Sequence, residues 1–319
     1  MGCVLFCLNG WHVRTRSSPL RIGTRGSKLA LVQANMVAGL LRGVGAASEI
    51  VVLKTTGDRI QDRSLADAGG KGLFVKELED ALLNDTIDLA VHSMKDVPVD
   101  LPPGLAITAV LKREDPRDVF VSNKAKTLAD LPQGAVLGTS SVRREAQVRR
   151  MRPDVKCVLL RGNVDTRLRK LNDGEMDAML LALAGLKRLG LESRATQMLD
   201  DFLPALSQGA IGIEIRDTDT HAREIVTQLN DKDTEVALDC ERAFQAALGG
   251  SCRSPMAGLA TVRDGVLSFR GEVIAPDGSD GVETRFTLTL GPDPRHEAEQ
   301  AGRNAGETLK PRAVQWLDL

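Results

Sequence analysis

Residues 135–151 and 155–172 have the sequences AVLGTSSVRREAQVRRM and VKCVLLRGNVDTRLRKLN, and both follow one design. Each begins with a short apolar run, Ala135–Leu137 or Val155–Leu160, continues through a polar loop and enters an arginine-rich helical pattern. Short apolar runs favour strands, and apolar residues that recur every three or four positions favour helices. Strand–helix alternation of this kind predicts an α/β fold with parallel-type sheets.

The same alternation extends along most of the chain. Further strands are predicted at Leu20–Gly23, Glu49–Leu53, Ile87–His92, Leu105–Leu111, Asp177–Leu183 and Ala210–Ile215. One helix should carry Leu29, Val32, Met36 and Leu40 on its apolar face, and a second should carry Phe74, Leu78, Ala81 and Leu82. Two α/β units in series predict two lobes, with a crossover at Arg113–Asn123 and a return to the first lobe at Ala210–Ile215.

The C-terminal part has a different pattern. A helix bearing Val236, Cys240, Ala243, Phe244 and Ala247 precedes three strand-like runs, at Ala257–Val262, Val266–Val273 and Glu283–Leu290. In the last run Phe286, Leu288 and Leu290 alternate with polar residues, as in an antiparallel sheet with one exposed face. A final helix around Glu297–Leu309 should cover one face of this sheet. This pattern predicts a small α+β domain.

These patterns divide the chain of 319 residues into parts. We expect a first α/β lobe of residues 20–112 and 210–229, a second lobe of residues 113–209, and a third domain of residues 230–319. Residues 1–19 contain an apolar run too short to span a membrane, and we expect a disordered extension there.

The charge balance excludes some classes of partner. Lys and Arg number 42 against 43 Asp and Glu, and aromatic residues make up 3% of the chain, with no Tyr. A neutral total and few aromatic residues argue against nucleic acid and membrane surfaces as partners. The segment Thr139–Gly190 nevertheless holds 12 basic against 6 acidic residues, which predicts an anion there. Five cysteines without metal-ligand spacing favour a reducing, cytoplasmic setting.

The two polar loops of the second lobe are candidate anion sites. Thr139 and Ser141 offer hydroxyls at a helix start that continues into Arg143 and Arg144. Arg161 and Arg167 flank the second loop, where Asn163 is a candidate N-cap. Helix capping with solvated arginines is the alternative for either loop alone. Two such loops at the carboxyl ends of strands favour a ligand site instead, and Arg25 and Ser27 repeat the pattern in the first lobe.

Three further residues have chemistry of their own. Asp96, beside Lys95 at a strand end before Pro98, is either a general acid and charge-stabilising carboxylate or a turn residue bonded to its own backbone. His92 fits a packed histidine. Cys252 lies in the glycine-rich loop GGSCRSP (residues 249–255) beside Arg253, and is either an activated or an unreactive thiol. Cys157 and Cys240 fit core packing.

Taken together and in this order, several motifs identify a family. The chain resembles porphobilinogen deaminases over residues 20 to 290 in the motifs RGSKLA (25–30), GKGLF (70–74), VHSMKDVP (91–98), REDPRD (113–118), GTSSVRR (138–144), RGNVDTR (161–167), GLKRLG (185–190), QGA (208–210) and CRSP (252–255). VHSMKDVP is the most specific of them. One departure is Ser251, which stands where the family usually has glycine.

The resemblance implies a fold and a chemistry. The two lobes would be similar to those of periplasmic binding proteins, and the third domain would carry a dipyrromethane cofactor through a thioether to Cys252. A transferase of this kind deaminates four porphobilinogen molecules, joins them head to tail on that primer and releases hydroxymethylbilane for tetrapyrrole biosynthesis.

The resemblance also assigns roles to residues. Asp96 would be the catalytic carboxylate, which stabilises an azafulvene cation and moves protons. The cofactor contacts would be Ser27, Lys95, Thr139, Ser141, Arg143 and Arg144. The substrate contacts would be Arg25, Phe74, Arg161, Arg167, Arg188 and Gln208. We expect no metal, no nucleic acid and no membrane, and a monomer with porphobilinogen as its small-molecule substrate.

Two other functions compete with this one. A non-catalytic anion-binding protein would use the two-lobe clamp alone, but it has no use for a loop cysteine in a third domain. A nucleic-acid-binding protein with a basic patch would bind with a steep salt dependence.

Overall fold

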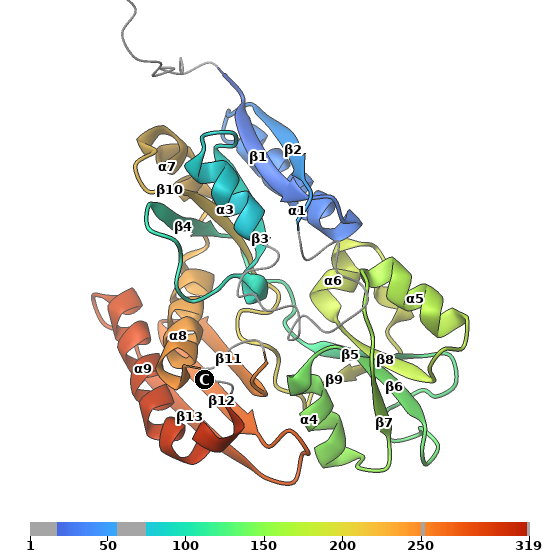
Figure 1. Cartoon of the computed structure of the whole chain (residues 1–319). Coiled ribbons are helices and arrows are strands. Elements are labelled where there is room, and N and C mark those ends of the chain that lie inside the picture. The colour runs from blue at the N-terminus through green and yellow to red at the C-terminus, as the bar shows by residue number, and fades with distance from the viewer. Residues whose placement is uncertain (1–17, 56–74, 250–252, 318–319) are drawn as a thin grey trace, which may run out of the picture.

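The computed structural model describes residues 18–55, 75–249 and 253–317, which form three separate β-sheets with helices packed on them (Figure 1). Two of these sheets have five strands, and the third has three. In Figure 1 the first sheet lies at the top, the second at the lower right and the third at the lower left.

The first lobe is the sheet of order β2-β1-β3-β10-β4 with its helices. Its strands are β1 (Leu20–Arg25), β2 (Ser48–Leu53), β3 (Leu89–Ser93), β4 (Leu105–Val110) and β10 (Ile211–Arg216). Its helices are α1 (Lys28–Gly43), α3 (Lys76–Leu83) and α7 (Thr220–Val226). β10 runs antiparallel to β3 and β4, so the predicted return of the chain to the first lobe is confirmed.

The second lobe is the sheet of order β7-β6-β8-β5-β9 with its helices. Its strands are β5 (Asp118–Ser122), β6 (Val136–Thr139), β7 (Lys156–Leu159), β8 (Ala178–Ala182) and β9 (Gln197–Leu199). Its helices are α4 (Val142–Met151), α5 (Val164–Asn172) and α6 (Leu183–Arg188). Residues 135–151 and 155–172 therefore form β6–α4 and β7–α5, as predicted.

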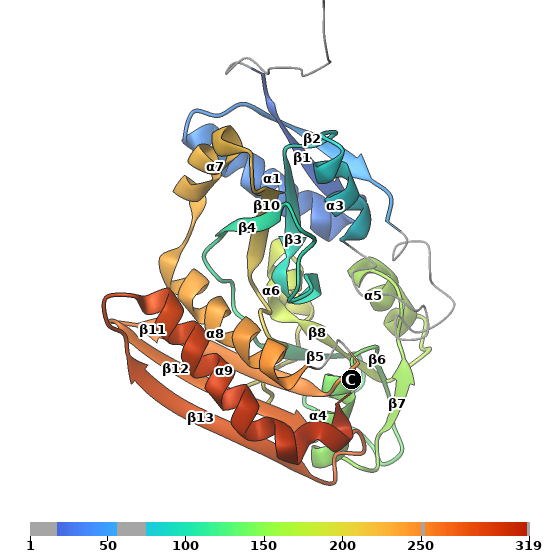
Figure 2. The same cartoon turned by 60° about the vertical axis from the view of Figure 1, so that its left-hand side comes forward.

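The C-terminal domain has two helices on one face of an antiparallel sheet (Figure 2). Its elements are α8 (Lys232–Leu248), β11 (Met256–Arg263), β12 (Val266–Ile274), β13 (Gly281–Thr289) and α9 (Pro294–Ala313). Phe244 of α8 meets Phe269 of β12 edge to face, with ring centroids 5.0 Å apart, at the centre of the core. None of the described helices is long and apolar enough to cross a lipid bilayer.

These observations confirm the predicted fold class, two α/β lobes plus a small α+β C-terminal domain, and correct three details. The sheets are mixed rather than parallel, because β10 and β5 run against their neighbours. The expected crossover at Arg113–Asn123 contains β5, which is a full member of the second sheet. The apolar run Val119-Phe120-Val121 is the signal that was missed.

The third correction concerns the buried face of α1. Ala34, Val37 and Leu41 face the core, whereas Met36 and Leu40 are 43% and 44% exposed. This helix has apolar residues on more than one face, so their spacing predicts the helix but not the side that packs on the sheet.

The two segments that connect the lobes run side by side. Glu114 N–H donates to the Gly209 carbonyl at 3.2 Å, and Gln208 Nε2 donates to the Pro116 carbonyl at 2.7 Å. Gly209 has a φ of +91°, and a Cβ there would lie 2.3 Å from the Glu114 carbonyl oxygen, so this close approach requires glycine.

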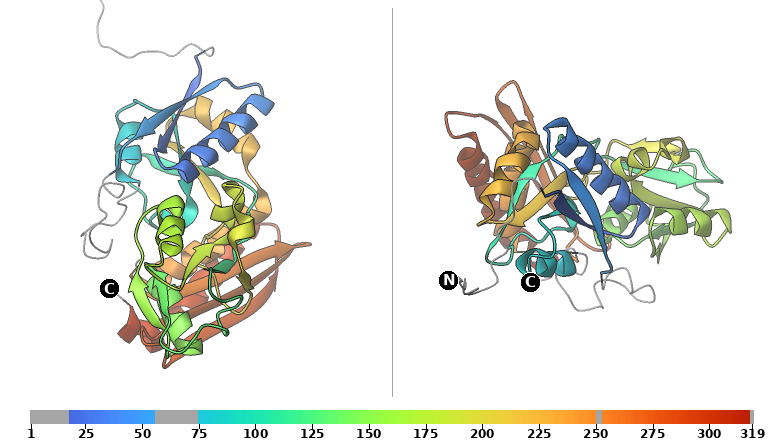
Figure 3. Two further views of the ribbon diagram at one scale, coloured as in Figure 1. Left: turned by 90° about the vertical axis from the view of Figure 1, so that its right-hand side faces the viewer. Right: turned by 90° about the horizontal axis from the view of Figure 1, so that it is seen from above.

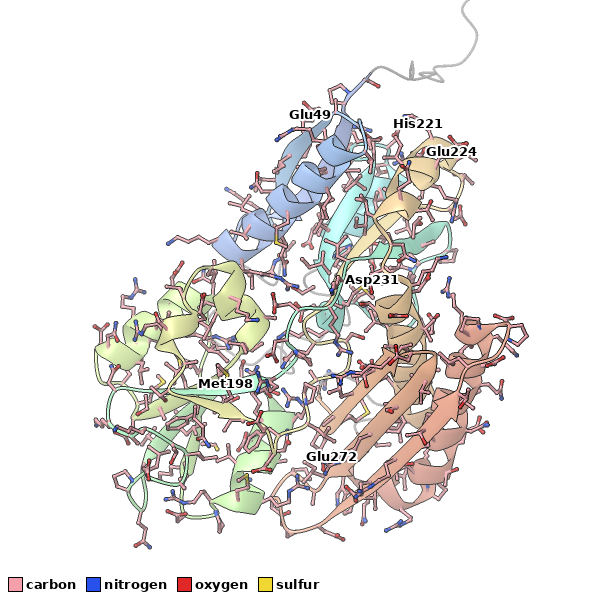
Figure 4. The ribbon with its side chains drawn as sticks, turned by 180° about the vertical axis from the view of Figure 1, so that it is seen from behind. Glu49, Met198, His221, Glu224, Asp231 and Glu272 are labelled. Atoms are coloured by element: carbon pink, nitrogen blue, oxygen red, sulfur yellow. The ribbon has the colours of Figure 1, made fainter. Side chains whose placement is uncertain are left out.

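Two ion pairs connect the C-terminal domain to the crossover segment and to the second lobe. Arg113, at the start of the crossover, pairs with buried Glu241 of α8 at 2.6 Å. Arg150 of α4 pairs at 3.1 Å with Glu272 of β12, which Figure 4 shows where the third sheet meets the second lobe. Viewed from above, the C-terminal domain and the second lobe lie on opposite sides of the first lobe (Figure 3).

Candidate active site

A cavity of about 1030 Å³ lies between the two lobes and reaches the C-terminal domain. Twelve of the fourteen predicted site residues line it: Arg25, Ser27, Lys95, Asp96, Thr139, Ser141, Arg143, Arg144, Arg161, Arg167, Arg188 and Gln208. The other two, Phe74 and Cys252, lie outside the described residues. Arg253 and Ser254, which directly follow Cys252, line the cavity as well.

Asp96 is held by a short turn whose underside is buried. The interior strand β3 ends at Ser93 and continues into a single 3₁₀ turn, η1 (Met94–Asp96). Met94 and Val97 are buried, and the Met94 N–H donates to the Ala210 carbonyl of the neighbouring segment at 3.1 Å. Lys95 and Asp96 are exposed and open onto the cavity. The turn thus presents a cation and a carboxylate on an apolar support.

The surroundings of Lys95 lower the pKa of its ammonium group. Its ammonium donates to Gln208 Oε1 at 3.3 Å. Although the side chain opens onto the cavity, desolvation by the closely surrounding protein lowers its pKa to about 8, and the positive charge of Arg144 contributes in the same direction. The carboxylates of Asp96 and Asp118 oppose this shift.

The polar loops cap the helices that follow them. Ser141 Oγ accepts from the Arg144 N–H at 3.4 Å, and Asn163 Oδ1 accepts from the Thr166 N–H at 3.3 Å, as predicted for Asn163. Ser27 Oγ caps α1 in the same way, accepting from the Ala30 N–H at 3.3 Å. Capping is therefore present in all three loops, and all three also border the cavity.

Arg143 and Arg144 have a partner that the sequence analysis missed. The fully buried carboxylate of Asp118 accepts from Arg143 Nη1 and from Arg144 Nη2, each at 2.7 Å. Gln208 Nε2 donates to the same carboxylate at 2.8 Å. These arginines are 4% and 6% exposed, so they are neither solvated nor wholly available to a ligand. The two cations hold the pKa of Asp118 far below its ordinary range, against the opposing effect of burial.

Three other arginines present guanidinium groups to the cavity: Arg161, Arg167 and Arg188. Arg167 Nε donates to the Gly162 carbonyl at 2.8 Å, and Arg188 Nη2 donates to the Gly209 carbonyl at 2.6 Å. Desolvation lowers the pKa of all three arginines, and that of Arg167 to about 10, with Arg144 and Arg161 adding to the effect. Cations that are crowded and partly dehydrated in this way favour an anionic ligand.

The remaining candidates behave as packing residues. His92 is buried and its Nε2 lies 2.8 Å from Glu214 Oε2, which confirms the packed histidine. Cys240 is in the core, as predicted. Cys157 is half-buried and borders the cavity, so its core assignment is only partly right, because β7 is the edge strand of its sheet.

The donor set of the cavity fits a group with several carboxylates. Nine basic side chains but two acidic ones, Asp96 and Glu145, are among the described residues that line it. Arg143 Nε and Arg188 Nε are buried and have no hydrogen-bond partner among those residues. Buried donors without acceptors are costly, so a ligand that brings anionic oxygens would stabilise them. The anion that the sequence predicts between the lobes agrees with this geometry.

Comparison with known proteins gives this site a family. Residues 20–224 match the model described as "Porphobilinogen deaminase, dipyromethane cofactor binding domain", and residues 236–311 match "Porphobilinogen deaminase, C-terminal domain". The porphobilinogen deaminase of Syntrophobacter fumaroxidans is 51% identical over 294 residues, which cover 91% of this chain and 94% of that protein. That of Nitrobacter hamburgensis is 52% identical over 298 residues, covering 92% and 93%.

Solved structures with a similar arrangement include two ligand-binding proteins. A periplasmic substrate-binding protein of an ABC transporter from Coxiella burnetii has a TM-score of 0.43 and 15% identity, covering 66% of this chain and 92% of that one. A methionine-binding lipoprotein from Bacillus subtilis, described as putative, has a TM-score of 0.41 and 12% identity, covering 66% and 89%. The family models and the two close relatives span both lobes and the C-terminal domain, and with them we conclude that this chain belongs to the porphobilinogen deaminase family.

Proposed function

We propose that the cavity between the lobes is the active site of this porphobilinogen deaminase and that Asp96 is its catalytic carboxylate. As a member of its family the chain is a transferase that deaminates porphobilinogen and joins four molecules head to tail, with a dipyrromethane cofactor. This membership favours catalysis over the anion-binding alternative. The observation that carries the proposal is that Asp96 stands among the basic side chains of one cavity.

The cofactor, when bound, supplies the primer to which substrate units are added. Each pyrrole unit carries an acetate and a propionate, and we propose that Arg161, Arg167 and Arg188 bind such groups. A guanidinium can hold a carboxylate through two parallel hydrogen bonds. Arg25, in the first lobe, would serve the same purpose from the opposite wall.

Asp96 would act on the charge that develops when the amino group leaves. A carboxylate at this point stabilises positive charge on the substrate carbon and can accept and return a proton. Lys95, the neighbouring residue, would bind a substrate or cofactor carboxylate while it is protonated. Thr139, Ser141, Ser27 and Gln208 would then position the loops, which agrees with the capping bonds that the serines accept.

Cys252 is our proposed attachment point for the cofactor. Gly249 ends α8 in the left-handed conformation, with a φ of +79°. Arg253, the residue after Cys252, lines the cavity. A cation next to a thiol favours the thiolate, which is the reactive form. Phe74 remains a proposed contact for a pyrrole ring.

The organisation of the whole protein is part of the proposal. We assign residues 20–112 and 210–229 to domain 1, residues 113–209 to domain 2 and residues 230–319 to domain 3, each built on one of the three sheets. We also propose that the protein acts as a monomer, since residues from all three parts of one chain line the cavity and none of the proposed steps calls for a second subunit. The sequence has five cysteines, and their spacing does not resemble a disulfide framework. This supports the cytoplasm as the location of the protein.

The test is a pair of matched substitutions. Asp96→Asn keeps the shape of the side chain but removes its charge, and we expect turnover to fall about 10²–10⁴-fold with little change in melting temperature. Asp100→Asn makes the same change four residues later, at an exposed position that does not line the cavity, and should leave turnover near normal. An Asp96→Asn enzyme that keeps more than about a tenth of its turnover would exclude Asp96 from this role.

A further inference from the structure

Arg242 of α8 is bonded to the segment that directly follows Asp96. Its Nη1 donates to the Val97 carbonyl at 3.2 Å, and its Nη2 donates to the Pro98 carbonyl at 2.5 Å and the Val99 carbonyl at 3.2 Å. One guanidinium from the C-terminal domain therefore binds three consecutive carbonyls of the first lobe. Arg242 does not line the cavity.

An apolar contact accompanies these hydrogen bonds. Leu238 lies one helical turn before Arg242 and is buried in one cluster with Met94 and Val97, the residues on the underside of the Asp96 turn. Residues four apart share a face of a helix. One face of α8 thus contacts the turn through packing and through hydrogen bonds.

The start of α8 is fixed to the first lobe as well. Asp231 caps the helix through the Thr234 N–H at 2.9 Å, and its own N–H donates to the Val110 carbonyl at 2.8 Å. Figure 4 shows Asp231 where the first lobe meets the C-terminal domain. Because both its first turn and its third turn are attached to the lobe, α8 offers Arg242 a rigid base.

The chemistry of Arg242 suits this task. Among the described residues no carboxylate lies within ion-pairing distance of its guanidinium, and desolvation lowers its pKa although Asp239, Asp100 and Glu214 exert an opposing effect. A partly buried cation without a paired anion is costly unless dipoles solvate it. Three converging carbonyls supply those dipoles, and the planar fork of arginine matches them better than the single ammonium of lysine does.

We propose that Arg242 is a positioning residue that sets the Asp96 turn relative to α8, the helix that leads into the loop of Cys252. The proposal rests on the catalytic role of Asp96 given above. Through Arg242, the Asp96 turn takes its position from the helix that ends at Gly249, three residues before Cys252 in the sequence. A displacement of about 1 Å in a reacting group can cost about 10²-fold in rate, so the three bonds act on turnover and not on stability alone.

Arg152 provides a matched control in the second lobe. Its Nη1 donates to the Leu128 and Ala129 carbonyls at 2.8 and 3.0 Å, and its Nη2 donates to the Leu131 carbonyl at 2.8 Å. It also holds a backbone loop through three carbonyls, but that loop does not border the cavity. Arg152 also pairs with Asp154 at 2.7 Å, so its replacement should cost at least as much stability as that of Arg242. If Arg242 also acts on stability alone, neither variant should lose turnover per folded molecule.

The experiment compares Arg242→Met with Arg152→Met in purified enzyme, after the cofactor-loaded fraction has been determined by intact mass. We expect kcat per loaded Arg242→Met molecule to fall about 10- to 100-fold, with KM for porphobilinogen changed by about twofold or less. Hydrogen exchange over residues 94–100 should become faster. Arg152→Met should lower only the melting temperature. Arg242→Lys keeps the charge and should recover part of kcat, and it serves as the measurement should the Met variant not fold.

A double-mutant cycle separates this inference from the role of Asp96. In an Asp96→Asn background Arg242→Met should cost little further turnover, because the group that it positions has already been removed. Equal losses in both backgrounds, or normal turnover with unchanged exchange over residues 94–100, would overturn the positioning role. If Asp96→Asn alone is active, the catalytic assignment fails, while the exchange data still decide whether Arg242 holds the turn.

Discussion

Arg144 donates two hydrogen bonds to one carboxylate oxygen of Asp118, from Nε at 3.1 Å and from Nη2 at 2.7 Å. Both side chains are closed to solvent, and Arg144 Nη1 donates to the Leu180 carbonyl. The fork that would bind a substrate carboxylate thus already holds a carboxylate of the protein. Arg144 anchors the start of α4, and Arg161, Arg167 and Arg188 are better placed to meet a ligand.

Asp118→Asn should therefore destabilise the protein strongly. It leaves Arg143 and Arg144 buried without their common anion, and removal of one partner from a buried ion pair typically costs about 3–5 kcal/mol. We expect this loss in the free energy of unfolding, measured by urea denaturation at neutral pH. The low pKa of Asp118 means that the carboxylate is charged in the folded state under these conditions.

Asp165→Asn is the control for that measurement. Asp165 pairs with Lys28 across the two lobes at 3.1 Å, but the side chains are 40% and 74% exposed. Exposed pairs contribute about 0–1 kcal/mol, so this variant should unfold close to the parent midpoint. Similar losses in the two variants would show that the Asp118 cluster is not the anchor that its burial indicates.

The sequence predicted the loops of this site better than it predicted their internal partners. Gly138–Ser141 and Arg161–Asn163 follow strands and precede helices, so local signals place them at one edge of a sheet, where the structure has them. Asp118 lies in the polar stretch REDPRD, and no local property distinguishes it from the exposed acids of other loops. Its contacts with Arg143 and Arg144 depend on how β5 enters the sheet.

The same limit applies to contacts between domains. Arg242 and Val97 are 145 positions apart, and helical periodicity marks Arg242 only as a polar residue on α8. Such pairs depend on the packing of one folded unit against another. An arginine one helical turn after an apolar core residue such as Leu238, on the same face of the helix, suggests a long-range partner but does not identify it.

Lys95 should make the pH profile of kcat/KM fall on its alkaline side, near the pKa of the Lys95 ammonium. As pH rises through about 8 the ammonium loses its proton, and the cavity loses a cation that would bind a substrate or cofactor carboxylate. We expect kcat/KM for porphobilinogen to decline above this pH, since this parameter reports groups of the free enzyme. In Lys95→Arg the guanidinium stays protonated, so this decline should move to higher pH whatever the absolute activity. An unchanged decline in that variant would assign the titration to another group.

Cys252 should carry two pyrrole units, and the two cysteines in the described part of the chain, Cys157 and Cys240, have properties that keep the cofactor from attaching to them. Burial raises the pKa of the Cys157 thiol to about 11, with Glu145 adding to the effect, and burial raises the pKa of Cys240 as well. Since the thiolate is the nucleophile, these two thiols stay unreactive at neutral pH even though Cys157 borders the cavity. Cys252 instead precedes Arg253 at the cavity wall.

Intact mass under denaturing conditions tests this directly, because a thioether survives unfolding whereas a bound ligand is lost. The parent enzyme, Cys157→Ser and Cys240→Ser should all show the polypeptide plus one dipyrromethane, while Cys252→Ser should show the bare polypeptide and lose most activity. Fully active parent enzyme with the mass of the bare chain would refute covalent attachment. An adduct that persists in Cys252→Ser would show that the cofactor is attached to another residue. Loss of the adduct in Cys157→Ser would identify the Cys157 thiol, at the edge of the cavity, as the acceptor despite its raised pKa.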